Sequence, residues 1–268
     1  MTLLLVKLTL APLLVVVSSL AARRWGAKVA GLLVALPIVA GPVLLIVAIE
    51  RGTHFAARAA SASLLGLAAL AAFVVVFARA ARAGSWAPAL AAGWTAFIAL
   101  ALALSTANVA AGIAFVIALC AFALAARLMP DDRRAAPPRG AELPLWDLPA
   151  RALATAVLVV CLTGAAGGLG ARVTGALTPF PVAMSVLAAF VLAQRGPRVS
   201  NELLRGFLRG AAGFAVFSLL VAVLVTPAGP GLAFALALLA AIGVQLLTRS
   251  IARGLADLRS VVRARAVA

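Results

Sequence analysis

Apolar residues dominate the chain in long stretches, and polar or basic residues are confined to short segments between them. About nine of these stretches are roughly 20 residues long, the length that an α-helix needs to cross the ~30 Å hydrocarbon core of a bilayer. None alternates apolar and polar positions as the strands of a membrane barrel do. The pattern therefore predicts an all-α, polytopic transmembrane helical bundle. The predicted spans are residues 2–21, 29–49, 59–78, 86–104, 108–127, 150–169, 172–194, 207–226 and 230–248.

One apolar segment occurs twice. Residues 26–52 align with residues 170–196 without a gap, at an offset of 144, and nine of the 27 positions are identical. Predicted helices one to four then pair with helices six to nine, and the unpaired fifth helix turns the second copy over in the membrane. The sequence predicts an inverted-topology repeat of five plus four helices, an arrangement common among secondary transporters.

The repeat divides the chain into domains. Residues 1–127 form the first transmembrane repeat and residues 150–248 the second. Residues 128–149 are rich in proline and polar residues, which predicts a cytoplasmic linker. Residues 249–268 place apolar residues at helical spacing among arginines. This pattern favours a basic amphipathic helix on the inner membrane surface, with a solvated tail as the alternative.

The charges predict an orientation. Hydrophobic residues make up 65% of the chain, far above the content of soluble domains, and 23 Lys and Arg face only 7 Asp and Glu. With nine spans, 19 basic residues fall on one side of the membrane and four on the other. The positive-inside rule then predicts a multi-pass protein of a bacterial-type inner (plasma) membrane, with its N-terminus outside and its C-terminus in the cytoplasm. Basic patches interleaved with aromatic residues are absent from the sequence, so we expect no nucleic-acid partner.

Two prolines mark a candidate substrate site. Pro37 and Pro181 occupy equivalent places well inside predicted helices two and seven. Proline removes a backbone hydrogen bond and clashes with the preceding turn, and in lipid the freed carbonyl needs a partner or a water-lined cavity. Thr178 and Ser185 add polar side chains beside Pro181. We predict that these four residues line a site between broken helices; a packed kink is the alternative.

Basic residues near helix ends have two interpretations. Arg205 and Arg209 lie one turn apart, and they either snorkel toward headgroups or clamp an anionic group. Arg209 is our candidate anion contact. Lys7 and Arg151 are equivalent residues of predicted helices one and six, and we expect both to snorkel.

The inventory of reactive side chains is small. Every acidic residue falls at a predicted helix end or in a loop, so no carboxylate is expected at the midplane, where proton-coupled carriers usually keep one. With one His and two Cys, we expect no metal site and no haem or other cofactor. The sequence offers neither the paired carboxylates nor the Ser/His arrangement of a hydrolase, and we do not expect an enzyme.

Three elements follow one another near the N-terminus: an apolar first helix, a basic loop with Arg23 and Arg24, and a Gly/Ala-rich second helix. The second helix contains Gly31 and the step Leu36–Pro37. This arrangement resembles the small GlpM-like inner-membrane proteins. Because the chain is about twice as long, the resemblance implies a fused duplication of such a unit. It implies no catalytic residues.

Together these patterns lead to one functional hypothesis and one alternative. The chain is expected to be an inner-membrane transporter or lipid translocase, with its site between the inverted repeats and an anionic or lipid-like substrate. The alternative is a non-transporting scaffold or accessory subunit that packs against a partner complex. The expected partners are membrane lipids and an unidentified small or lipid-like substrate, and self-association stays open. A hydrated midplane cavity would favour transport, whereas a dry, tightly packed interface would favour the scaffold.

Overall fold

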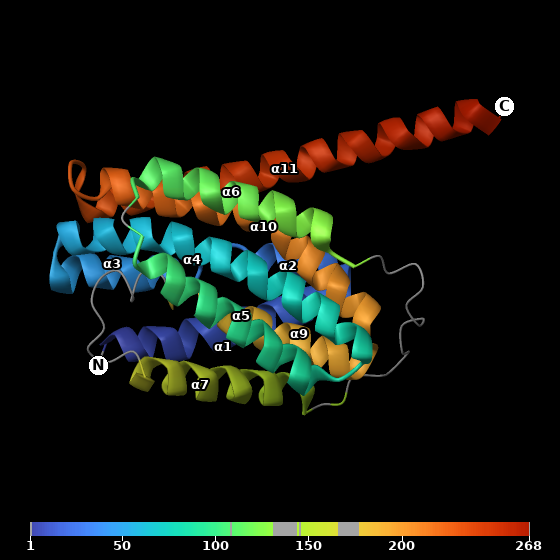
Figure 1. Ribbon diagram of the computed structural model, residues 1–268, viewed down its shortest axis with the longest axis horizontal. Coiled ribbons are helices and arrows are strands. Elements are labelled where there is room, and N and C mark those ends of the chain that lie inside the picture. The colour runs from blue at the N-terminus through green and yellow to red at the C-terminus, as the bar shows by residue number, and fades with distance from the viewer. Residues whose placement is uncertain (1, 108, 131–143, 145, 166–176, 268) are drawn as a thin grey trace.

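The computed structural model describes residues 2–107, 109–130, 144, 146–165 and 177–267, and every regular element among them is a helix. The prediction of an all-α fold is therefore confirmed. Most of the predicted 128–149 linker lies outside the described residues. The helices are α1 (Thr2–Trp25), α2 (Ala27–Val34), α3 (Ala40–Arg51), α4 (Thr53–Ala80), the short 3-10 helix η1 (Ala81–Ala83), α5 (Trp86–Ser105), α6 (Ala111–Leu128), α7 (Asp147–Ala165), α9 (Val182–Arg195), α10 (Pro197–Leu224) and α11 (Gly229–Val267), as Figure 1 shows.

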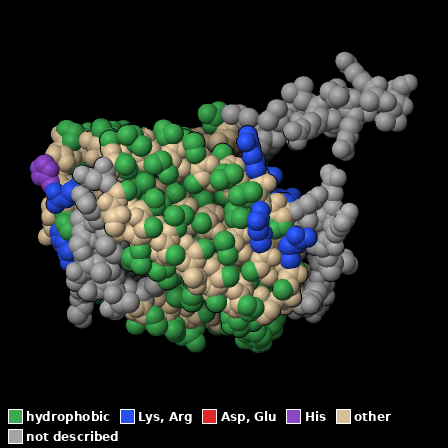
Figure 2. Space-filling view, viewed as in Figure 1, with side chains coloured by type: hydrophobic (Ala, Val, Ile, Leu, Met, Phe, Trp, Pro, Cys, Tyr) green, Lys and Arg blue, Asp and Glu red, His purple; other side chains and the backbone are tan. Residues whose placement is uncertain are grey.

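Six of the described helices are long and apolar enough to cross a membrane: α1, α4, α5, α6, α10 and α11. Two of them, α4 and α10, are mostly buried and form the centre of the bundle, while α5, α6 and α11 turn most of their residues outward. On the face shown in Figure 2, hydrophobic side chains are spread along the middle, and Lys and Arg gather toward the two ends. An apolar exterior of this kind fits a multi-pass membrane protein, because lipid rather than water solvates it.

The central helices α4 and α10 match each other along the chain. Each has 28 residues, and their first and last residues differ by the same 144 positions that separate the sequence repeats. Each follows an equivalent glycine, Gly52 or Gly196, whose φ is 85°. Only glycine adopts this backbone conformation without strain, which explains why both copies retain it.

The same two helices run in opposite directions. Arg79, near the end of α4, donates to the carbonyl of Leu128, and Arg205, near the start of α10, donates to the carbonyl of Pro130. The end of α4 and the start of α10 therefore lie at the same end of the bundle, beside the end of α6 (Figure 1).

Two glycines bring α2 against α10. A Cβ atom at Gly31 would overlap the backbone carbonyl of Leu203, and one at Gly206 would overlap that of Lys28. Small residues at such crossings let helix backbones approach closely, and in a membrane this van der Waals packing supplies much of the association energy.

The last helix differs from the expectation for residues 249–268. Helix α11 continues without a break to Val267, so the C-terminal segment extends the membrane helix beyond the bundle instead of forming a separate element (Figure 1). Side chains after Ser250 lie outside the described residues, so the predicted contact with the membrane surface stays a prediction.

We expect Gly206→Ala to destabilise the protein. The added methyl would force α2 and α10 apart, and overpacking of this kind costs roughly 1–3 kcal/mol. Thermal unfolding of the purified protein in one detergent measures the effect. Gly112→Ala on α6 is the matched control, because a Cβ there meets nothing within 4 Å. Equal melting temperatures for the two variants would contradict the close α2–α10 contact.

Candidate functional site

Two of the predicted spans are broken near their repeated prolines. The helix that begins at Ala27 ends at Val34 and resumes at Ala40, so Pro37 lies in the gap between α2 and α3. Residues 178–181 form the second gap, and α9 begins immediately after Pro181. The helix break predicted at Pro37 is confirmed. At Pro181 the described residues show a non-helical segment directly before α9, and residues 172–176 of the predicted span lie outside the described residues.

The two breaks have the same backbone hydrogen bonds. A tight three-residue turn centres on each proline, and the φ and ψ of Pro181, −77° and 53°, are those of an inverse γ-turn. One further bond precedes this turn and one follows it. In the first break the bonds run from the N–H of Leu36 to Leu33 O (3.1 Å), of Ile38 to Leu36 O (2.8 Å) and of Gly41 to Pro37 O (2.8 Å); in the second, from Phe180 to Leu177 O (2.9 Å), Val182 to Phe180 O (2.8 Å) and Ser185 to Pro181 O (2.7 Å).

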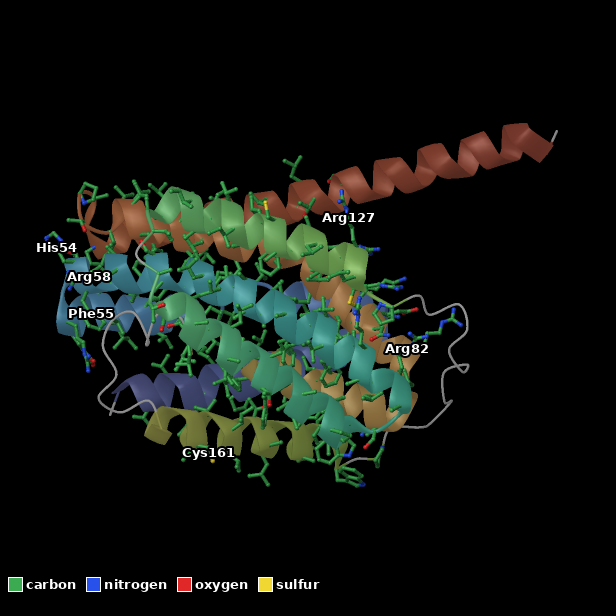
Figure 3. The ribbon with its side chains drawn as sticks, viewed as in Figure 1. His54, Phe55, Arg58, Arg82, Arg127 and Cys161 are labelled. Carbon is green, nitrogen blue, oxygen red and sulfur yellow. The ribbon has the colours of Figure 1, made fainter. Side chains whose placement is uncertain are left out.

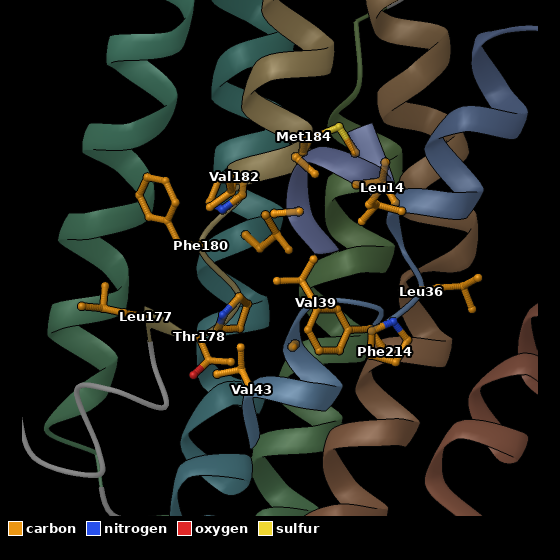
Figure 4. Close-up of a pocket in the computed structure, with 18 of the residues that line it drawn as sticks. Leu14, Leu36, Val39, Val43, Leu177, Thr178, Phe180, Val182, Met184 and Phe214 are labelled. Atoms are coloured by element: carbon orange, nitrogen blue, oxygen red, sulfur yellow. The ribbon is translucent and has the colours of Figure 1, made fainter. Parts of the chain in front are cut away.

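A cavity of about 210 Å³ lies between the two breaks (Figure 4). Both prolines line it, together with the first turns of α3 and α9. Its remaining walls come from α1, α2, α4, α7 and α10, including Leu14, Val159 and Phe214. The cavity therefore lies where segments from the two halves of the chain meet.

The lining of the cavity is apolar. Among the described residues that line it, Thr178 has the one polar side chain apart from the weakly polar thioether of Met184, and none is charged. Phe180 closes one wall, with its ring centroid 5.2 Å from that of Phe97 in an edge-to-face contact and 5.9 Å from that of Trp94. Such a site can bind an apolar body, with Thr178 as the one clearly polar side chain in its described lining.

The structure brings three of the five predicted site residues together. Pro37, Thr178 and Pro181 all line the cavity. Ser185 is fully buried but accepts a hydrogen bond from Nε1 of Trp94 at 2.8 Å, and it is not among the lining residues. Arg209 is exposed on α10 and does not line the cavity either. Substrate contacts for these five residues stay a prediction.

A buried ionic network lies at one end of the bundle, and the sequence did not lead us to expect it. Asp147, at the start of α7, is fully buried and accepts three hydrogen bonds: from Arg23 (2.8 Å), from Nε of Arg151 (2.8 Å) and from Gln194 (2.7 Å). Arg151 also donates to Gln194 at 2.8 Å and lies over the ring of Phe190. The network thus links α1, α7 and α9.

The expectation that Arg151 snorkels is wrong. Only 3% of Arg151 is exposed, because Asp147 one turn earlier on α7 neutralises its charge inside the protein. The spacing of four residues between this acid and this base was visible in the sequence and typically indicates a pair on a helix face. Nothing local indicated burial, because Arg23 and Gln194 come from distant parts of the chain. The side chain of Lys7 lies outside the described residues.

No protein-family model, curated protein or solved structure matches the chain.

We expect the bond between Trp94 and Ser185 to show up in a double-mutant cycle. Trp94→Phe alone leaves a buried hydroxyl without its donor, whereas Ser185→Ala combined with Trp94→Phe removes both partners and costs less than the sum of the single changes. The expected coupling is about 0.5–1.5 kcal/mol, measured by unfolding of the four proteins under one condition. Strictly additive losses would mean that the hydrogen bond contributes nothing.

Proposed function

We propose that this protein is an inner-membrane transporter whose substrate site is the cavity between the breaks at Pro37 and Pro181. The main support for this proposal is the position of the cavity. It lies between two helix interruptions, one in each half of the chain, that have the same backbone hydrogen bonds. Broken helices that meet at the interface of two repeats are how many secondary transporters build a site near the membrane midplane.

We also propose nine spans arranged as an inverted repeat. In this interpretation α2 and α3 are one span interrupted at its centre, α9 is the second half of its counterpart, and α7 adds a further span. Three observations support the proposal: the common offset of the ends of α4 and α10, their opposite directions, and the burial of the equivalent residues Phe73 and Phe217. A fused duplication of a GlpM-like unit is our proposal for the origin of the two copies.

The cavity favours one class of substrate among those considered from the sequence. An engineered cavity of about 150 Å³ in another protein binds benzene, and drug-sized ligands occupy about 300–1,000 Å³. A site of about 210 Å³ suits a small solute better than a whole phospholipid. Because no described lining residue carries a charge, an uncharged, largely apolar molecule with one hydrogen-bonding group fits better than an anion.

The scaffold alternative is less well supported. A scaffold needs only packed helices, and in membranes these pack closely through small residues, as α2 and α10 do. Nothing in such a role requires a cavity beside two broken helices, since each break gives up regular helical hydrogen bonds.

Filling the cavity is expected to abolish solute binding. Ala40 lines the cavity at the first turn of α3, and Ala40→Phe would occupy much of its volume. The probe is indole, an uncharged molecule with an apolar body and one N–H group; benzoate is its charged counterpart. We expect indole to raise the melting temperature of the wild-type protein in nanodiscs, and Ala40→Phe to remove that shift.

Ala123→Phe is the matched control, because Ala123 is exposed on α6 and does not line the cavity. It should keep the response to indole. A shift of equal size in Ala40→Phe, or a response to benzoate but not to indole, would contradict the proposed substrate class.

The proposed orientation has its own test. Arg82 and Arg127 lie at one end of the bundle, and His54 and Arg58 at the other (Figure 3). The positive-inside rule favours the end with Arg82 and Arg127 as the cytoplasmic one. A C-terminal reporter that is active only in the cytoplasm should therefore function, and one that is active only outside should stay silent. The reverse pattern would refute the proposed orientation.

A further inference from the structure

We propose that the Asp147 network is a gate that holds the cavity closed toward the cytoplasmic side. This inference deepens the proposed function and rests on it, because it treats the cavity as the transport site. The network consists of Asp147, Arg151, Arg23 and Gln194, which cross-link the ends of α1, α7 and α9.

The three linked helices also form walls of the cavity. Leu14 of α1, Val159 of α7 and Met184 of α9 all line it. With a rise of 1.5 Å per residue, the network lies about 14 Å, 18 Å and 15 Å farther along these three helices.

Gln194 is near the end of α9, directly before the start of α10, which lies at the same end of the bundle as the end of α4. This is the end with Arg82 and Arg127 (Figure 3). Separation of α9 from α1 and α7 at this end would open a path to the cavity from the side that we assign to the cytoplasm.

One carboxylate holds the cross-link together. Asp147 is fully buried and accepts a hydrogen bond from each of the other three residues. Every hydrogen bond between helices in the network therefore involves Asp147 or its partner Arg151. Charge-assisted hydrogen bonds of this kind are about twice as strong as neutral ones. Without the negative charge, Arg151 would be left buried without an anion, and movement of α7 toward water would relieve that cost.

Arg23 gives the network a route to opening. Its side chain is 32% exposed, compared with 0% for Asp147. When the bond to Asp147 breaks, water can solvate the guanidinium of Arg23 with little further movement. The closed arrangement is therefore stable, but its hydrogen bonds can break one after another. The bond between Arg23 of α1 and Asp147 breaks first.

The sequence repeat makes the gate one-sided. The positions equivalent to Asp147, Arg151, Gln194 and Arg23 are Leu3, Lys7, Glu50 and Gly167. The first copy thus has Leu3 in place of the acid Asp147, and the second copy has Gly167 in place of the base Arg23. The opposite end of the bundle keeps a base and an acid at Lys7 and Glu50, but it cannot build the same four-membered network from equivalent positions. The Asp147 network therefore belongs only to the end that we assign to the cytoplasm.

Cysteine accessibility tests the gate. Cys120 and Cys161 are replaced by Ala, and Ala183→Cys puts a single thiol at the cavity wall on α9. A charged, membrane-impermeant maleimide is then applied to inverted vesicles and, separately, to intact cells. We expect Asp147→Asn to raise the labelling rate at the cytoplasmic face at least tenfold, with no change at the outer face.

Two further variants make the result decisive. Glu202→Gln removes a carboxylate outside the network and near the same end of the bundle, and it should leave labelling unchanged. Arg23→Gln breaks only the strut to α1; because Arg23 is partly exposed, this variant should fold even if Asp147→Asn does not, and it should raise cytoplasmic labelling several-fold.

Unchanged labelling in a folded Asp147→Asn or Arg23→Gln protein would overturn the gate, as would faster labelling from the outer face alone. The assay needs no transported solute, so it separates the two proposals. Faster cytoplasmic labelling without any solute binding would retain the gate and contradict the substrate site.

Discussion

Backbone amides and carbonyls have no water to bind in the interior of a bilayer, and this constraint determines where the helices of the protein can be interrupted. An unsatisfied backbone group there costs several kcal/mol. Both breaks meet the constraint largely through local bonds: each proline carbonyl accepts a bond from the first turn of the following half-helix, and the carbonyl before each proline is closed into a tight turn. In the first break the carbonyl of Leu32 also accepts a bond from Nε2 of Gln245 on α11, at 2.7 Å. The interruptions therefore need no charged side chain to be stable.

That local solution explains why the cavity is apolar. If the breaks left many carbonyls free, ionised or strongly polar side chains would have to surround them. Here the walls beside the breaks are Leu36, Val39 and Phe180, and Thr178 is the one clearly polar side chain among the described lining residues. Backbone geometry thus creates an irregular space at the centre of the bundle, and the choice of side chains keeps charge out of it.

The helix interruptions at Pro37 and Pro181 could be predicted, because a proline inside an apolar helix kinks or breaks it. The all-α fold followed for the same reason, since lipid leaves long apolar segments little choice but helix. The hydrogen bond of the Ser185 side chain with Trp94, which turns it away from the cavity lining, could not be predicted, because Trp94 lies 91 residues away in the chain. The burial of Arg151 was missed because it depends on Asp147, Gln194 and Arg23 meeting in space.

Comparison of the two copies separates what the backbone requires from what the side chains add. Gly52 and Gly196, like Pro37 and Pro181, are identical because each sets a backbone conformation that both copies need. Gly41 and Ser185 are equivalent but differ: a Cβ atom at Gly41 would lie 3.4 Å from the ring of Phe217, while Ser185 uses its side chain to bind Trp94.

The same divergence at Leu3 and Asp147 places a buried acid in one copy only. A duplicated scaffold in which both ends were equally tied would have no preferred side of opening. Substitutions at a few helix ends would be sufficient to give the proposed gate a single side, and they would leave the breaks beside the cavity unchanged.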